Sequence, residues 1–298
     1  EFIGEGVRNL PVEFRNGIDV MTTETGCWSS IWITDDMVRD YYETHGRLSD
    51  YNKIYPDDIA LYDGLVEVDL SKIKPSIALP FHPSNVYTIE ELKENATEIF
   101  ADVEKNSQEV FGSSDVHVDL MSKIKDGQIH FEQGIIVGCA GGTFDNIMAA
   151  ADILRGKSIG NGSFSLSIYP GSQPTYLELV RNGAVADLIA AGALIKSAFC
   201  GPCFGAGDTP ANNEFSIRHA TRNFPNREGS KPTEGQVSLV ALMDARSIAA
   251  TAANQGVLTA ADEINVNFTS KKYYFDKTIY EKRVFNGWGK EDPSANLI

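Results

Sequence analysis

The stretch Gly134-Ile135-Ile136-Val137-Gly138-Cys139 is an apolar run that ends in a glycine and a cysteine. A second such run ends at Ala198-Phe199-Cys200-Gly201-Pro202-Cys203-Phe204-Gly205. Each run is typical of a short strand, and each leads into glycine-rich sequence. Ligands of open α/β sheets bind in the loops at the carboxyl ends of the strands. We therefore expect Cys139, Cys200 and Cys203 to meet at one edge of a sheet.

Strands and helices alternate along the chain from residue 128 onward. The patterns predict strands over 128–139, 163–169, 194–199, 215–222 and 237–242, and helices over 144–154, 174–181, 185–191 and 245–255. This order is typical of the α/β class, and we predict doubly wound, mainly parallel β-sheet domains flanked by helices. Right-handed crossovers then place all the strand ends, and with them the three cysteines, on one edge.

The first third of the chain is more mixed. We predict a short helix over 17–26, and a helix that Thr34 or Asp35 caps and Gly46 ends. Alternating apolar and acidic residues predict a strand over 66–70, and a capping box at Thr88 predicts a helix towards Val110. We expect three parts: a partial α/β domain over 1–65, a cysteine-bearing α/β domain over 66–285, and a linker over 286–298.

Composition limits the classes of function. The 298 residues are 42% hydrophobic and 10% aromatic, which is typical of a globular protein. The net charge of −15 argues against binding to nucleic acid or to an anionic membrane surface. No apolar run reaches the roughly 18 residues of a membrane span. Four cysteines, two of them in a C-x-x-C, favour metal or redox chemistry in a reducing, cytoplasmic compartment over a disulfide scaffold.

The C-x-x-C pair by itself is open to three interpretations: a thioredoxin-like redox pair, half of a zinc site, or part of an iron–sulfur site. A redox pair is disfavoured because 204–208 is a poor helix start, and a zinc site would need a fourth ligand. We interpret Cys27 as a packed core residue and His219 as a packed or solvated histidine. Three thiolates around a metal leave one position open for a substrate. The residues alone leave an iron–sulfur site and an incidental origin both open.

An arginine motif follows the predicted strand after the C-x-x-C. Thr221-Arg222-Asn223-Phe224-Pro225-Asn226-Arg227 enters a loop that the same sheet edge could hold. Guanidinium groups bind carboxylates with two parallel hydrogen bonds, so Arg222 and Arg227 are candidates for carboxylate binding. A solvated basic loop is the alternative.

These motifs, in the order Gly138-Cys139, Pro170-Gly171-Ser172, Cys200-Gly201-Pro202-Cys203-Phe204-Gly205 and Arg222-Asn223-Phe224-x-x-Arg227, resemble the aconitase and isopropylmalate dehydratase family of iron–sulfur hydro-lyases. The likeness looks closest to the mitochondrial-type aconitases. It extends to Glu1-Phe2-Ile3-Gly4-Glu5-Gly6-Val7 and covers nearly the whole chain.

The resemblance implies a 4Fe-4S cluster held by Cys139, Cys200 and Cys203. It further implies that Arg222 and Arg227 bind substrate carboxylates. Glu1 corresponds to a family glutamate near the labile iron, and Thr221 replaces an asparagine that contacts the cluster. The implied reaction is reversible dehydration and hydration of a hydroxy di- or tricarboxylate of the citrate and isocitrate type.

Two departures from the family pattern affect this expectation. Ala140-Gly141-Gly142 stands where the family usually has Thr-Asn-Ser or Thr-Asn-Gly. The family's amino-terminal domain and its carboxyl-terminal swivelling domain have no counterpart here, so we expect a fragment that depends on those domains and is inactive alone. The alternative is a cluster-free or zinc-binding α/β module that keeps the fold without the chemistry.

Overall fold

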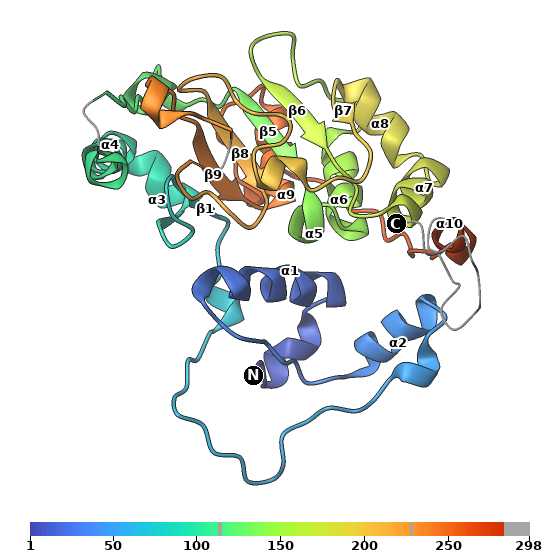
Figure 1. Cartoon of the computed structure of the whole chain (residues 1–298). Helices are drawn as coiled ribbons and strands as arrows, with labels where there is room; N and C mark the ends of the chain where they lie inside the picture. The colour runs from blue at the N-terminus through green and yellow to red at the C-terminus, as the bar shows by residue number, and fades with distance from the viewer. Residues whose placement is uncertain (113–114, 227–228, 283–298) are drawn as a thin grey trace, which may run out of the picture.

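A seven-stranded sheet organises the larger part of the molecule, in the order β2-β1-β9-β8-β5-β6-β7 (Figure 1). The computed structural model describes residues 1–112, 115–226 and 229–282. Arg227 and the linker predicted over 286–298 lie outside these residues. The strands are β1 (Ser76–Ala78), β2 (Val86–Thr88), β5 (Gln133–Ile136), β6 (Ser165–Ile168), β7 (Leu194–Ile195), β8 (Phe215–His219) and β9 (Leu239–Met243). A separate hairpin pairs β3 (Ile124–Lys125) with β4 (Gln128–Ile129).

Five neighbouring strands of the sheet, from β9 to β7, run parallel, and β1 pairs antiparallel with both β2 and β9. Helices flank the sheet: α3 (Ile89–Glu94), α4 (Ala96–Phe111), α6 (Phe144–Leu154), α7 (Gln173–Arg181), α8 (Ala184–Ala191) and α9 (Ala245–Ala253). The predicted α/β fold with a mainly parallel sheet is confirmed. The helix predicted to run unbroken from Thr88 is divided at Asn95 into α3 and α4.

Most of the core lies on one face of the sheet. Phe215, Ile217 and Ile136 share a single apolar cluster with residues of α3, α4, α6, α7, α8 and α9. Alanines in α6 and α9 let these two helices pack closely, and α9 approaches β5 so closely that a Cβ on Gly134 would lie 3.2 Å from Ile248 Cγ2. The opposite face carries a second, smaller cluster that includes Ile135, Leu242 and Cys203. The two faces therefore differ in what covers them.

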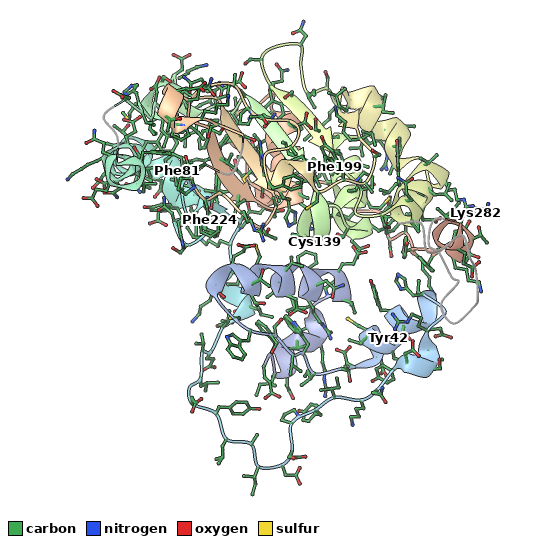
Figure 2. The ribbon with its side chains drawn as sticks, viewed as in Figure 1. Tyr42, Phe81, Cys139, Phe199, Phe224 and Lys282 are labelled. Carbon is green, nitrogen blue, oxygen red and sulfur yellow. The ribbon has the colours of Figure 1, made fainter. Side chains whose placement is uncertain are left out.

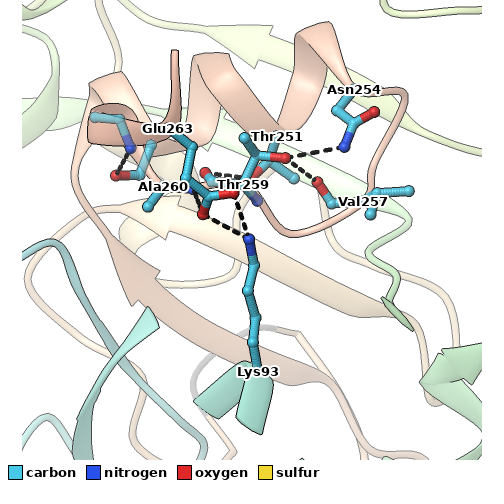
Figure 3. Close-up of polar contacts among 9 residues, drawn as sticks. Lys93, Thr251, Asn254, Val257, Thr259, Ala260 and Glu263 are labelled. Carbon is cyan, nitrogen blue, oxygen red and sulfur yellow. Dashed lines mark hydrogen bonds and ion pairs between the residues drawn. The ribbon is translucent and has the colours of Figure 1, made fainter. Parts of the chain in front are cut away.

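The chain after α9 is tied back to the sheet domain by polar contacts (Figure 3). Thr251 Oγ1 donates to Thr259 O at 3.2 Å and accepts from Thr259 N at 3.1 Å. Lys93 Nζ, on α3, lies 2.5 Å from Glu263 Oε1. The contact between Lys93 and Glu263 joins two segments that are 170 residues apart in sequence.

The first 50 residues form a smaller unit around α1 (Val12–Thr22) and α2 (Asp36–Thr44). Arg15 is buried, and its guanidinium pairs with Asp35 at 2.6 Å and donates to Val7 O at 3.0 Å. Asp35 also caps α2, as predicted, by accepting from Val38 N at 3.1 Å. The helix predicted from residue 17 begins earlier, at Val12, and Gly17 lies inside it.

An extended segment over 51–69 connects this unit to the sheet domain (Figure 1). The strand predicted over 66–70 is wrong: no strand forms there, and Val66 and Val68 are exposed. The alternating pattern indicated a half-buried strand, but within the described residues no strand pairs with it. Ile59, Leu61, Leu65 and Val66 are each at least 85% exposed. The predicted boundary between residues 65 and 66 falls in this segment and stays a prediction.

Candidate functional site

Cys139 lies just beyond the carboxyl end of β5. Gly138 has a φ of +73°, a left-handed conformation that turns the chain into the one-turn helix α5 (Gly138–Gly141). The Cys139 side chain is exposed at this end of the sheet (Figure 2). The turn thus presents the thiol at the strand end where the sequence predicts it.

The glycines after Cys139 are required by close packing. A Cβ on Gly141 would lie 2.3 Å from the carbonyl oxygen of His219, at the end of β8. A Cβ on Gly142 would lie 2.4 Å from the carbonyl oxygen of Tyr169, after β6. Gly141 and Gly142 therefore let α5 rest directly on the backbone at the ends of two strands.

Cys200 and Cys203 lie in the loop that follows β7. Cys203 N donates to Cys200 O at 3.1 Å, and Ala206 N donates to Gly201 O at 2.9 Å, so the pair forms a tight turn. Cys200 is exposed, whereas Cys203 is buried. Cys203 Sγ is 3.3 Å from the place that a Cβ on Gly138 would occupy. The C-x-x-C turn therefore lies against the residue that precedes Cys139.

Electrostatic interactions connect all three thiols with Arg222. Partial desolvation raises the pKa of the Cys139 thiol, the neighbouring Cys200 raises it further, and Arg222 partly opposes this effect. A hydrogen bond from its side chain to Glu24 raises the pKa of Arg222, and Cys203 and Cys200 contribute in the same direction. These interactions place Cys139, Cys200 and Cys203 within electrostatic range of Arg222.

The thiols are chemically suited to hold a metal centre, but they do not stand as a preformed one. All four cysteines of the chain are thiols rather than disulfides. Within residues 1–112, 115–226 and 229–282, no group of three or more His, Cys, Asp or Glu side chains is arranged to hold a metal ion. A three-cysteine centre fits this donor set, provided that the exposed thiols of Cys139 and Cys200 turn inward to meet Cys203.

Glu24 is a residue of this site that the sequence did not reveal. Arg222 Nε donates to Glu24 Oε1 at 2.5 Å, and the Glu24 side chain is only 10% exposed. Glu24 lies in the short turn after α1, 198 residues from Arg222. Its acidic side chain in a predicted helical segment gave no local signal of this contact. Met21, on α1, packs against the small apolar cluster that contains Cys203, so α1 covers this side of the site.

The other predicted site residues lie as follows. Glu1 is exposed and accepts a hydrogen bond from the Tyr62 hydroxyl. In Figure 1 the N-terminus lies below α1, whereas α5 lies above α1. Thr221 is buried just after β8. Roles for Glu1 and Thr221 stay predictions, and Arg227 lies outside the described residues.

Cys27 and His219 are two further candidates whose surroundings the structure shows. The interpretation of Cys27 as a packed core residue is wrong: it is exposed, 3.2 Å from Thr25 Oγ1, because it lies in a connection beside the fully exposed Trp28. His219 is a packed histidine whose Nδ1 accepts from Ala245 N at 3.0 Å. Burial lowers its pKa to about 4, so the ring is neutral at neutral pH.

Comparison with known proteins adds to this geometry. The model of the aconitase family (aconitate hydratase) matches residues 1–250. This chain belongs to the aconitase family. The matched region contains all three candidate cysteines and Arg222, and the predicted resemblance is confirmed.

Curated members of the aconitase family match most of the chain. The 3-isopropylmalate dehydratase large subunit of Clostridioides difficile (strain 630) is 29% identical over 252 residues, which are 83% of this chain and 51% of that protein. The 2,3-dimethylmalate dehydratase large subunit of Eubacterium barkeri is 29% identical over 265 residues, which are 89% of this chain and 53% of that protein. The chain thus spans about half the length of these relatives. Among the helices that the structure describes, none has the length and apolar character needed to span a membrane.

Proposed function

We propose that this chain is the cluster-bearing section of an iron–sulfur hydro-lyase, with a 4Fe-4S cluster held by Cys139, Cys200 and Cys203. The observation that supports the proposal is that thiols from two separate strand ends lie near one another and within electrostatic range of Arg222. Membership of the aconitase family supports it. The three thiols and the absence of a secretory disulfide pattern support a reducing, cytoplasmic compartment.

The proposed reaction is reversible dehydration and hydration of a hydroxy di- or tricarboxylate. A bound cluster with one iron free of cysteine supplies a Lewis acid for the substrate hydroxyl. Arg222 is proposed to bind a substrate carboxylate, since its guanidinium is a planar fork of donors. Glu24 holds Arg222 through Nε and leaves the outer nitrogens for the substrate. Further proposed contacts are Arg227 with the substrate and Thr221 with the cluster. Glu1 is proposed to lie near the iron that has no cysteine ligand.

The substrate of this section is proposed to be a substituted malate rather than citrate. The relatives are named for 3-isopropylmalate and 2,3-dimethylmalate, which both carry alkyl groups on a malate skeleton. Citrate and isocitrate, which the resemblance first indicated, are the competing substrates. Direct comparison of these acids in a dehydration assay separates the two groups.

The remaining parts of the catalytic machinery are proposed to come from other domains or a partner chain. The matched region covers only 51% and 53% of these relatives. Ile59, Leu61, Leu65 and Val66 present exposed apolar side chains that such parts could cover. A general base must reach the proton that it removes, so we expect the 298-residue chain to be inactive without them.

Reconstitution of the chain with iron and sulfide under anaerobic conditions tests the proposal. We expect about four irons and four sulfides per chain with visible absorption from thiolate-to-iron charge transfer, and loss of both in Cys139→Ser, Cys200→Ser and Cys203→Ser. The matched control is Cys27→Ser, which removes the one cysteine outside the site. Full cluster content in any of the three site variants contradicts the proposed ligand set. Zinc bound in place of iron, or no metal at all, would support the alternative of a module without the chemistry.

A further inference from the structure

Arg218 is the largest side chain that is fully buried among the described residues. It lies on β8 in register with Ile135 of β5 and Leu242 of β9. Both of these residues belong to the small apolar cluster that also contains Cys203. Arg218 therefore faces the side of the sheet that the C-x-x-C loop covers, and not the large core. A guanidinium in such a place must donate its hydrogen bonds to acceptors within the protein.

The guanidinium of Arg218 binds the backbone of the C-x-x-C loop at two points. Nη1 donates to the carbonyl oxygen of Pro202 at 2.6 Å, and Nη2 donates to the carbonyl oxygen of Asp208 at 3.0 Å. Pro202 stands between the two cysteines of the pair. One rigid side chain thus holds the loop both inside the C-x-x-C turn and five residues after Cys203.

Neighbouring polar groups fix the direction of the Arg218 side chain. Ser216 Oγ accepts from Nε at 3.1 Å, and Gln133 Oε1 accepts from Nη2 at 3.3 Å. Gln133 Nε2 also donates to Asp208 O at 3.0 Å, and the Tyr169 hydroxyl donates to Asp208 Oδ2 at 2.6 Å. The network therefore joins β5, β8 and the residue that follows β6 to one loop.

The loop itself has little regular structure to hold it in place. Gly205, Gly207 and Asp208 have φ values of +80°, +137° and +45°, and the left-handed backbone of Asp208 is uncommon for a residue with a side chain. Such a conformation persists only where the surroundings impose it. The contacts from Arg218 and Gln133 to Asp208 O supply that constraint.

From these contacts we infer that Arg218 is the positioning residue for the Cys200–Cys203 half of the metal site. The inference rests on the proposed function, because it assigns Arg218 a role in metal binding by the three thiols. The planar fork of arginine holds two carbonyl oxygens at a fixed spacing, which the single ammonium of lysine cannot do. Loss of a group that orients metal ligands costs about 10–100-fold in metal affinity, and Arg218 orients two of the three.

The test uses Arg218→Lys in the metal-free, reduced 298-residue chain, with Cd²⁺ as the probe. Thiolate-to-cadmium charge-transfer absorption reports how many cysteines bind each ion. We expect Arg218→Lys to bind Cd²⁺ about 10–100-fold more weakly and with less absorption per bound ion. Amide hydrogen exchange over 200–208 should become faster while β5 and β8 stay protected. Arg155→Lys, at the end of α6 with ion pairs to Asp152 and Asp187, is the matched control and should change neither quantity.

The outcomes separate this inference from the proposed function. Failure of the unaltered chain to bind Cd²⁺ through its thiols overturns both. Unchanged affinity, absorption and loop exchange in Arg218→Lys overturn the role of Arg218 and leave the proposed function intact. Equal loss of protection in β5 and in the loop would mark Arg218 as a core residue only.

If Arg218→Lys does not fold, Gln133→Leu takes its place. This variant keeps Arg218 but removes the hydrogen bond from Arg218 Nη2 to Gln133 Oε1 and the one from Gln133 Nε2 to Asp208 O. A smaller loss of Cd²⁺ affinity and faster loop exchange are then expected, and no change in either refutes the inference.

Discussion

Replacing Gly141 by alanine tests whether α5 must rest on β8 for the site to form. The added Cβ would lie 2.3 Å from the His219 carbonyl oxygen and 2.9 Å from His219 Cβ. An ordinary carbon–oxygen contact is about 3.3 Å or more, so α5 would have to move away from β8 by about 1 Å. His219 cannot yield easily, because its backbone belongs to a central strand and its ring accepts from Ala245 N.

The expected cost follows from two opposing effects. Overpacking of a well-packed interior costs about 1–3 kcal/mol, and a clash with backbone belongs to the upper part of that range. Alanine in a helix gains about 0.5–1 kcal/mol over glycine. The net expectation for Gly141→Ala is a loss of about 1–2 kcal/mol in the free energy of unfolding, or a fall of roughly 2–6 °C in Tm for a chain of this size.

Thermal and urea unfolding of Gly141→Ala and of a control variant, Gly162→Ala, provide the assay. The matched control is Gly162→Ala, because Gly162 lies in an exposed connection with no atom within 4 Å of an added Cβ. Its stability should change by about 0.5 kcal/mol or less. Because α5 carries Cys139, Gly141→Ala should also weaken Cd²⁺ binding by the thiols. Equal stability of Gly141→Ala and Gly162→Ala would refute the packing argument.

Further expectations concern the carboxylates around the site and the helix beside it. Glu24→Gln removes the charge that neutralises Arg222, so the pKa of the Cys139 thiol should fall. Alkylation of Cys139 by iodoacetamide at neutral pH, measured by peptide mass spectrometry, should then become faster. An unchanged rate of alkylation argues against the proximity of Arg222 and Cys139. Burial raises the pKa of the Glu13 carboxyl above its ordinary value of 4.5, so its contribution to stability is present below pH 4.5 and is lost as the pH rises through the raised value. Glu13→Gln should therefore reduce the loss of unfolding free energy between mildly acidic and neutral pH, and identical pH profiles would count against this assignment. Gly17→Ala, inside α1 with open space around it, should stabilise the chain by about 0.5–1 kcal/mol in urea unfolding, and destabilisation would mean that α1 packs differently.

Local patterns predicted the five parallel strands of the sheet, but not β1 and β2 at its antiparallel edge. The predicted helix over 144–154 matches α6, whereas β5 ends at Ile136 and β7 at Ile195, three and four residues before the predicted strand ends at Cys139 and Phe199. Parallel strands joined by right-handed crossovers bring their carboxyl ends to one edge, which is why the convergence of three distant cysteines could be expected. Family membership likewise followed from the spacing of short motifs along the chain.

Tertiary structure alone decided which side chains complete the site. Arg222 donates a hydrogen bond to Glu24, which is 198 residues away in sequence. Arg218 donates to the carbonyl oxygens of Pro202 and Asp208 on the face of the sheet opposite the large core. A strand pattern predicts only that a position is buried. An arginine at such a position interrupts the run of apolar residues, so the local sequence does not predict that its side chain is buried. The alternation over 66–70 failed for the same reason, since a strand needs a partner that its own sequence does not specify. Periodicity and motif spacing are properties of neighbouring residues, whereas pairing, burial and charge neutralisation depend on which distant surfaces the fold brings together.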